Sequence, residues 1–369
     1  MDTAPAMWQS QYVTAIQLAG FRQYKYIAVD TNPLSVYVMQ PLWERIVKIL
    51  PLWIAPNLLT ITGFVIILIH YFVLSFYDWD YTAADSIDGK HARRTRSNTP
   101  LGELFDHGLD SWASSVITLS VFSILSRDNG KVGTSVSTMY LCLCVILLNF
   151  MLSHWEKYNT GILFLPWSYD ISQVVIVGLY LVTAAFGVEV WHTPFIFGYY
   201  LTDTLIMLII VCCIFLSLPQ MLYNIHIAYR KQALLKDSLY EGLLPLFSPM
   251  LLFALLTIWV ALSPCQILVK QTRLFLWMTG VLFSNVMCRM IICQMTNTRS
   301  EVLHWLLVPL AVMVCTATAG FQGRLEEPIL AAFAVLATAA HVHYGICVGK
   351  QLSQHFNIYI FSLKKRIQE

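Results

Sequence analysis

Two short stretches carry the most information in this chain: Asp85-Ser-Ile-Asp88-Gly89-Lys-His-Ala92-Arg93 and Gly102-Glu-Leu-Phe-Asp106-His-Gly-Leu-Asp110. Their aspartates are spaced three and four residues apart, and a helix brings residues at these spacings onto one face. Ionised carboxylates are costly close to lipid, so such a cluster in an apolar chain indicates a functional site. Carboxylates without a matching set of thiols or imidazoles favour hard, oxygen-preferring cations. We therefore predict a site for two Mg²⁺ or Mn²⁺ ions, held by Asp85, Asp88, Asp106 and Asp110.

The residues around the aspartates suit a ligand that contains phosphate. Gly102 lies one helical turn before Asp106 and leaves that part of the face bare, so a ligand can come close. Four basic residues lie between the two aspartate pairs, where a phosphate chain could bind: Lys90, Arg93, Arg94 and Arg96. A solvated acidic loop is the simplest alternative, but the fixed glycines and the arginine argue against it. The stretch predicts phosphoryl chemistry on a diphosphate.

The composition is that of a membrane protein with many spans. Hydrophobic residues make up 57% of the chain and charged residues only 12%, and the mean hydropathy is +0.63. The net charge of +2 gives no argument for nucleic-acid binding. We expect the nine cysteines to be small buried hydrophobes rather than disulfides or metal ligands. No cleaved signal peptide is expected from the N-terminal residues.

Nine apolar runs are long enough to cross a bilayer as helices, which predicts an all-α membrane bundle. The runs are 54–76, 106–126, 134–153, 171–188, 197–219, 246–263, 274–296, 303–321 and 328–348. We expect one membrane domain over residues 54–349, an amphipathic interfacial segment over 1–53 and a short basic cytoplasmic tail over 350–369. The dominant feature is thus a helical bundle with the aspartates at a membrane boundary.

The positive charges conflict with this count in the first third of the chain. Basic residues favour the cytoplasmic side, and one basic cluster precedes the first apolar run while another follows it. A single span would put the two clusters on opposite sides. The motif loop, the basic loop near 230–236 and the basic C-terminus agree with one another, so only the N-terminus is out of step.

The spacing D-x2-D-G-x2-A-R-x8-G-x3-D-x3-D resembles that of the CDP-alcohol phosphotransferases and is met at every position. Residues 100–110 resemble the eukaryotic choline/ethanolamine branch of this family. Residues 26–35, 153–167 and 341–345 are similar to its ethanolaminephosphotransferases in particular. Family members have about ten spans, and a second helix leads directly into the first two aspartates. Here residues 77–84 are too few and too polar to cross, so the resemblance implies that a segment of about one helix is missing.

The resemblance implies transfer of phosphoethanolamine from CDP-ethanolamine to diacylglycerol or alkyl-acylglycerol, giving phosphatidylethanolamine and CMP. The four aspartates would hold two metal ions, and His107 or Asp110 would take the proton of the lipid hydroxyl. The CDP moiety would lie against a set of residues from both stretches and from the start of the first span: Asn57, Gly89, Ala92, Arg93 and Gly102. The expected location is the endoplasmic reticulum or Golgi membrane, with the active site facing the cytosol. The chain could also form a homodimer.

Simpler interpretations stand beside several of these roles. His107 could be a packing residue, and Asn57 could simply cap the first membrane helix. Glu156 and Lys157 suit a surface charge pair, or a part of the head-group region. His341 and His343 do not share a helical face, which argues against joint metal binding. Arg289 lies inside an apolar run and needs a partner.

Three other functions compete with the ethanolamine enzyme. The same chemistry with CDP-choline, or with both donors, is the nearest. The missing helix favours a catalytically impaired chain that acts as a non-enzymatic membrane partner, whereas the intact motif opposes it. A transporter is the weakest rival, because the chain lacks the paired broken helices of such proteins.

Overall fold

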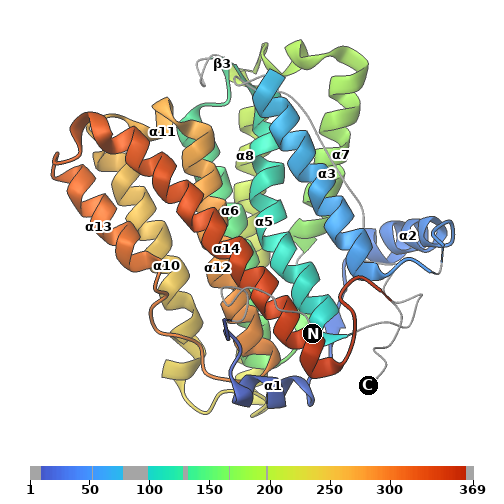
Figure 1. The fold of residues 1–369 in the computed structure, drawn as a ribbon. Helices are drawn as coiled ribbons and strands as arrows, with labels where there is room; N and C mark the ends of the chain where they lie inside the picture. Colours follow the sequence, from blue (N-terminus) through green and yellow to red (C-terminus); the bar gives the residue numbers. More distant parts are fainter. Residues whose placement is uncertain are drawn as a thin grey trace.

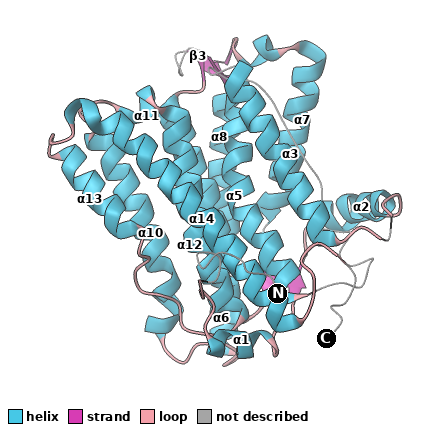
Figure 2. Ribbon diagram, viewed as in Figure 1, coloured by secondary structure: helices cyan, strands magenta, loops and turns pink. Residues whose placement is uncertain are grey.

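The computed structural model describes residues 10–51, 53–77, 99–127, 132–165, 167–196 and 198–362. In this part of the chain helices form a single bundle, and the strands are limited to three short two-stranded pairs (Figures 1 and 2). The predicted all-α class is confirmed. All nine cysteines are free. Three of them are buried, five are half-buried and Cys315 is exposed, so the expectation of buried side chains holds only in part.

Nine helical segments coincide with the nine predicted spans. Six have the length and composition of membrane spans: α5 (Pro100–Leu125), α6 (Val136–Thr160), the continuous segment Leu201–Arg230, α10 (Leu239–Leu262), α12 (Thr272–Met295) and Gly323–Phe356. The other three are shorter apolar helices, within α3 (Pro56–Tyr77), α7 (Trp167–Phe186) and α13 (Leu307–Thr318). α5 begins six residues before the predicted span, because Thr99 caps it and Pro100 occupies its first turn.

The remaining elements connect or cover these helices. The segment Leu201–Arg230 contains α8 (Leu201–Cys212), a π turn η4 (Cys213–Ser217) and α9 (Leu218–Arg230), and Gly323–Phe356 contains η5 (Gly323–Leu325) and α14 (Glu326–Phe356). Short elements are β2 (Ser126–Arg127), β3 (Val132–Gly133), η3 (Val188–Trp191), β5 (Pro194–Ile196), β6 (Tyr199–Tyr200) and α11 (Ile267–Lys270). β2 pairs with β3 and β5 with β6, both antiparallel.

α5 and α12 form the most intimate helix pair, and small residues line their contact. Ser111 Oγ lies 2.7 Å from Ser284 Oγ, and a Cβ on Gly108 would lie 3.2 Å from Cys288 Sγ. At Gly280 the backbone approaches Ser115 so closely that an added Cβ would be only 2.1 Å from its Oγ. Small residues at four-residue intervals let membrane helices approach in this way. The helix that carries Asp106 and Asp110 is therefore fixed against α12.

α3 and α5 run parallel and start at the same end of the bundle, the lower end in Figure 1. Asn57, at the start of α3, lies beside Gly102, at the start of α5. Further along both helices the rings of Phe64 and Trp112 are in contact, with centroids 5.1 Å apart. The end of α3 and the start of α5 therefore lie at opposite ends of α3, which is roughly 33 Å long for its 22 residues. The connecting residues 78–99 include eight charged residues, a composition that does not suit a crossing through lipid. This geometry supports the expectation of a missing span.

The N-terminal segment crosses the end of the bundle where α3 and α5 begin. It contains α1 (Ala15–Phe21), β1 (Ala28–Val29), η2 (Ser35–Met39) and α2 (Gln40–Val47). β1 pairs in parallel with β4 (Leu163–Phe164), which follows α6. At Gly20 the segment touches the backbone of Thr296 after α12, where a Cβ would lie 2.5 Å from the carbonyl oxygen. These contacts hold residues 10–34 against the ends of α5, α6 and α12.

Candidate active site

Asp106 and Asp110 lie on the second and third turns of α5, and they share a face of that helix as predicted. Asp106 is half-buried and Asp110 is exposed. The other predicted ligands and nucleotide contacts, Asp85, Asp88, Gly89, Ala92 and Arg93, lie outside the described residues. Within the described residues no group of three or more histidine, cysteine or acidic side chains could hold a metal ion. The four-carboxylate site therefore stays a prediction, of which α5 supplies one half.

Gly102 and Asn57 lie side by side at the start of α5. Thr99 Oγ1 accepts a hydrogen bond from the Gly102 N–H (3.0 Å), and a Cβ on Gly102 would lie 3.2 Å from Asn57 Oδ1. Asn57 is the second residue of α3, and its Nδ2 donates to the carbonyl of Ile360 after α14 (2.9 Å). The interpretation of Asn57 as a helix cap is therefore wrong, because its amide ties α3 to the C-terminal segment. The two residues predicted to contact the nucleotide are adjacent.

His107 lies inward of the aspartates, among other aromatic rings. Its ring centroid is 5.1 Å from that of His154 and 6.3 Å from that of Tyr26. His107 Nδ1 is buried and has no hydrogen-bond partner within the described residues. A buried polar atom without a partner is unusual in a residue that only packs. The base stays a prediction, with His107 and Asp110 as its two candidates.

A buried ion pair adjoins this group, and the sequence did not predict it. Lys157 Nζ lies 2.6 Å from Glu103 Oε1, and the exposed fractions of the two side chains are 1% and 11%. The interpretation of Glu156 and Lys157 as a surface charge pair is wrong, since both are 1% exposed. Glu156 instead accepts a hydrogen bond from Asn224 Nδ2 on α9 (2.8 Å). One signal was available: Glu103 lies one turn before Asp106 and His107 on the same helix.

Tyr24 and Tyr26 bring the N-terminal segment to this ion pair. The Tyr24 hydroxyl donates to Glu103 Oε1 (2.5 Å), and Lys157 Nζ lies 5.6 Å and 4.9 Å from the ring centroids of Tyr24 and Tyr26. Burial and the neighbouring Glu103 carboxylate raise the pKa of Tyr24 well above its usual value, so the hydroxyl stays a donor. The amide of Gln294 joins the group: its nitrogen donates to His154 Nδ1 (3.0 Å) and its oxygen accepts from Lys157 Nζ (3.2 Å).

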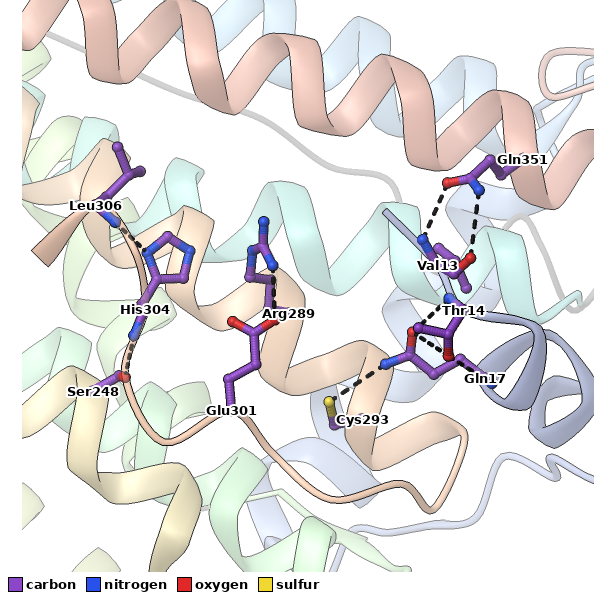
Figure 3. A network of polar contacts seen from close by, with 10 residues as sticks. All are labelled: Val13, Thr14, Gln17, Ser248, Arg289, Cys293, Glu301, His304, Leu306 and Gln351. Carbon is purple, nitrogen blue, oxygen red and sulfur yellow. Dashed lines mark hydrogen bonds and ion pairs between the residues drawn. The ribbon is translucent and has the colours of Figure 1, made fainter. Parts of the chain in front are cut away.

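Arg289, which needs a partner inside its apolar run, forms an ion pair with Glu301. Its Nη1 lies 2.8 Å from Glu301 Oε1, in the loop after α12 (Figure 3). The guanidinium carbon lies 5.8 Å and 5.1 Å from the ring centroids of Tyr12 and Tyr344. In the same figure Gln351 and Cys293 hold the start of the N-terminal segment through Val13 and Gln17. This network packs the N-terminal segment against α12 and α14.

His341 and His343 contact different parts of the bundle. The two nitrogens of His341 lie 3.3 Å from Ser284 Oγ and 3.2 Å from Asn285 Nδ2 on α12. His343 Nδ1 lies 3.0 Å from the hydroxyl of Tyr12 instead. The two histidines therefore face different neighbours, as their spacing predicts.

Comparison with known proteins identifies close relatives of the whole chain. It is 47% identical to "Ethanolaminephosphotransferase 1" from Homo sapiens over 96% of this chain and 95% of the relative. The mouse protein of the same name is 46% identical over the same shares. "Choline/ethanolaminephosphotransferase 1" from Saccharomyces cerevisiae is 28% identical over 96% of this chain and 98% of the relative. No family model matches the chain.

The length of the human alignment shows by how much the two aligned chains differ in size. It spans 380 positions, whereas 96% of 369 residues is about 354, so about 26 positions of the relative face a gap in this chain. That is about the length of one membrane helix. Apart from this difference in length, the motif and the relatives indicate the same family. The chain belongs to the eukaryotic ethanolaminephosphotransferases of the CDP-alcohol phosphotransferase family.

Proposed function

We propose that this protein transfers phosphoethanolamine from CDP-ethanolamine to the free hydroxyl of diacylglycerol or alkyl-acylglycerol, giving phosphatidylethanolamine and CMP. The observation that carries the proposal is the pair Asp106 and Asp110 on one face of α5, with Gly102 one turn earlier, in a chain 47% identical to the human enzyme. The lipid oxygen forms a bond to the β-phosphorus as the bond to the CMP oxygen breaks. The lipid hydroxyl proton passes to a base on the protein.

The side chains that are present suit hard divalent cations, since Asp106 and Asp110 offer carboxylate oxygens and no thiol. These two residues, with Asp85 and Asp88, would hold two Mg²⁺ or Mn²⁺ ions, which stabilise charge on the diphosphate and on the leaving CMP. Gly102 leaves room for the nucleotide against the start of α5, and Asn57 flanks it. His107 Nδ1, buried and without a partner in the described part of the chain, is one candidate to take the proton, and Asp110 is the other.

The proposed location is the endoplasmic reticulum or Golgi membrane, with the site open to the cytosol, where a water-soluble nucleotide meets a lipid alcohol. We further propose that a span is missing between residue 77 and Asp85. The parallel start of α3 and α5 and the gap of about 26 positions support this.

A transfer assay tests the function. Two chains are compared in lipid nanodiscs with labelled CDP-ethanolamine and CDP-choline. One is the unmodified chain, and the other is a segment-restored chain in which an apolar helix long enough to cross the membrane is inserted before Asp85. We expect the segment-restored chain to turn over CDP-ethanolamine in preference to CDP-choline. Equal or reversed preference would move the protein to the choline or dual-specificity branch. No lipid product from either donor would favour the non-enzymatic membrane partner.

A further inference from the structure

The buried ion pair between Glu103 and Lys157 has no role in the reaction as described so far. Taking two charges out of water costs free energy, and a buried pair is often no more stabilising than apolar residues of the same size. Yet Lys157 is 1% exposed and its ammonium lies 2.6 Å from Glu103 Oε1. A costly pair of this kind, one helical turn from a predicted active site, points to a function beyond packing.

The surroundings of the pair are those of an ammonium-binding site. The carboxylate of Glu103 is fixed by the Tyr24 hydroxyl, and the rings of Tyr24 and Tyr26 lie within 6 Å of the bound ammonium. Cations over aromatic faces at this distance are attracted by the ring electrons. Because Gly20 contacts the Thr296 backbone and β1 pairs with β4, the N-terminal segment holds both rings in place.

The pair has unused hydrogen-bonding capacity. Tyr24 and Lys157 both donate to Oε1 of Glu103, and Oε2 accepts no hydrogen bond from the described residues. An ionised carboxylate accepts about four hydrogen bonds, and an ammonium donates three. Glu103 can therefore accept a further cationic donor on Oε2, while Lys157 keeps a donor for an anion.

The pair also lies close enough to Asp106 to reach the head group of a bound CDP-ethanolamine. Glu103 precedes Asp106 by three residues on α5, a rise of about 4.5 Å along the same face. The ring of Tyr26 lies beside Lys157 and also beside His107. A head group whose phosphate lies at Asp106 would therefore reach Glu103 with its other end.

We propose that Glu103 and Lys157 form a subsite for the zwitterionic phosphoethanolamine group of the donor, an inference that rests on the proposed function. Glu103 Oε2 accepts a hydrogen bond from the primary ammonium, and the Lys157 ammonium faces a phosphate oxygen. Tyr24 and Tyr26 flank the bound cation. Each charge of the ion pair thus gains a second partner of opposite charge, so no buried charge is left without a partner. A quaternary ammonium has no N–H to donate to Glu103, so the subsite favours ethanolamine over choline.

Equilibrium binding to the unmodified chain in nanodiscs with Mg²⁺ tests the subsite, using CDP-ethanolamine, CDP-choline and CMP as ligands. We expect CDP-ethanolamine to bind about tenfold more tightly than CDP-choline, as for one hydrogen bond to a charged group. Glu103→Gln should reduce that ratio to near one and leave CMP affinity unchanged. The matched control is Glu327→Gln, which removes an exposed ion pair with Lys270 (3.6 Å) and should preserve the ratio.

A second variant keeps the test decisive if Glu103→Gln does not fold. Tyr26→Leu removes one aromatic face and should weaken both ammonium donors a few fold while CMP binds as before. A retained ratio in Glu103→Gln, or a parallel loss of CMP binding in either variant, would overturn this inference alone. If neither the unmodified nor the segment-restored chain binds any of the three nucleotides, the proposed function fails together with the subsite.

Discussion

Gly280→Ala should separate α5 from α12 and so displace the proposed metal ligands. The added Cβ would lie 2.1 Å from Ser115 Oγ and 2.5 Å from Ser115 Cβ, whereas ordinary contacts are 3.4–4 Å. Rotating the Ser115 hydroxyl relieves only the first clash, so the two helices must move apart by about 1 Å. Overpacking of this kind costs about 1–3 kcal/mol. Because a shift of 1 Å can reduce a catalysed rate about a hundredfold, activity should fall by about that factor.

Two quantities are measured with and without Gly280→Ala. They are the thermal unfolding of the unmodified chain and the rate of transfer by the segment-restored chain. Gly178→Ala in α7 is the matched control, since its Cβ would meet nothing within 4 Å and should leave both quantities unchanged. Adding Ser115→Gly to Gly280→Ala should restore most of the loss, because the small residue then lies on the other helix. Wild-type unfolding and activity in Gly280→Ala would refute the role assigned to this contact.

Three further variants address the site and the N-terminal segment beside it. Asp106→Asn and Asp110→Asn keep the size of the side chain but remove its charge, so transfer by the segment-restored chain should fall at least about a hundredfold. After chelation, activity should require added Mg²⁺ or Mn²⁺. Most activity retained in either variant would contradict the metal assignment. Gly20→Ala places a Cβ 2.5 Å from the Thr296 carbonyl oxygen and should displace Tyr24 and Tyr26, which limited proteolysis of the N-terminal segment would detect, with Gly345→Ala as the unaffected control.

The bundle could be predicted from the sequence because apolar runs of membrane length have few alternatives to helix. All nine predicted spans coincide with helices, although α5 begins earlier and α14 continues to Phe356. The helix ends were harder to place, since Pro100 and the cap at Thr99 extend α5 into a polar stretch. α3 and α5 start at the same end of the bundle, and a basic cluster precedes each of them in the sequence. This agrees with the expectation from the charges that both clusters lie on the same side of the membrane.

The contacts within the site could be predicted only in part. The face shared by Asp106 and Asp110 follows from helix periodicity. The ion pair between Glu103 and Lys157 joins residues 54 positions apart, and no pattern of spacing links them. In the same way, the amide of Asn57 reaches Ile360, which only the packing of α3 against the C-terminal segment reveals. Sequence periodicity describes one helix at a time, so partners between helices appear only in the folded chain.

The central claim is tested most directly by transfer of labelled phosphoethanolamine from CDP-ethanolamine to diacylglycerol, measured side by side for the unmodified and the segment-restored chain. The account predicts phosphatidylethanolamine and CMP from the segment-restored chain, and a rate lower by about a hundredfold or more from the unmodified chain, because the aspartates are then held imprecisely. Equal rates would contradict the missing span. No product from the segment-restored chain would contradict the proposed function.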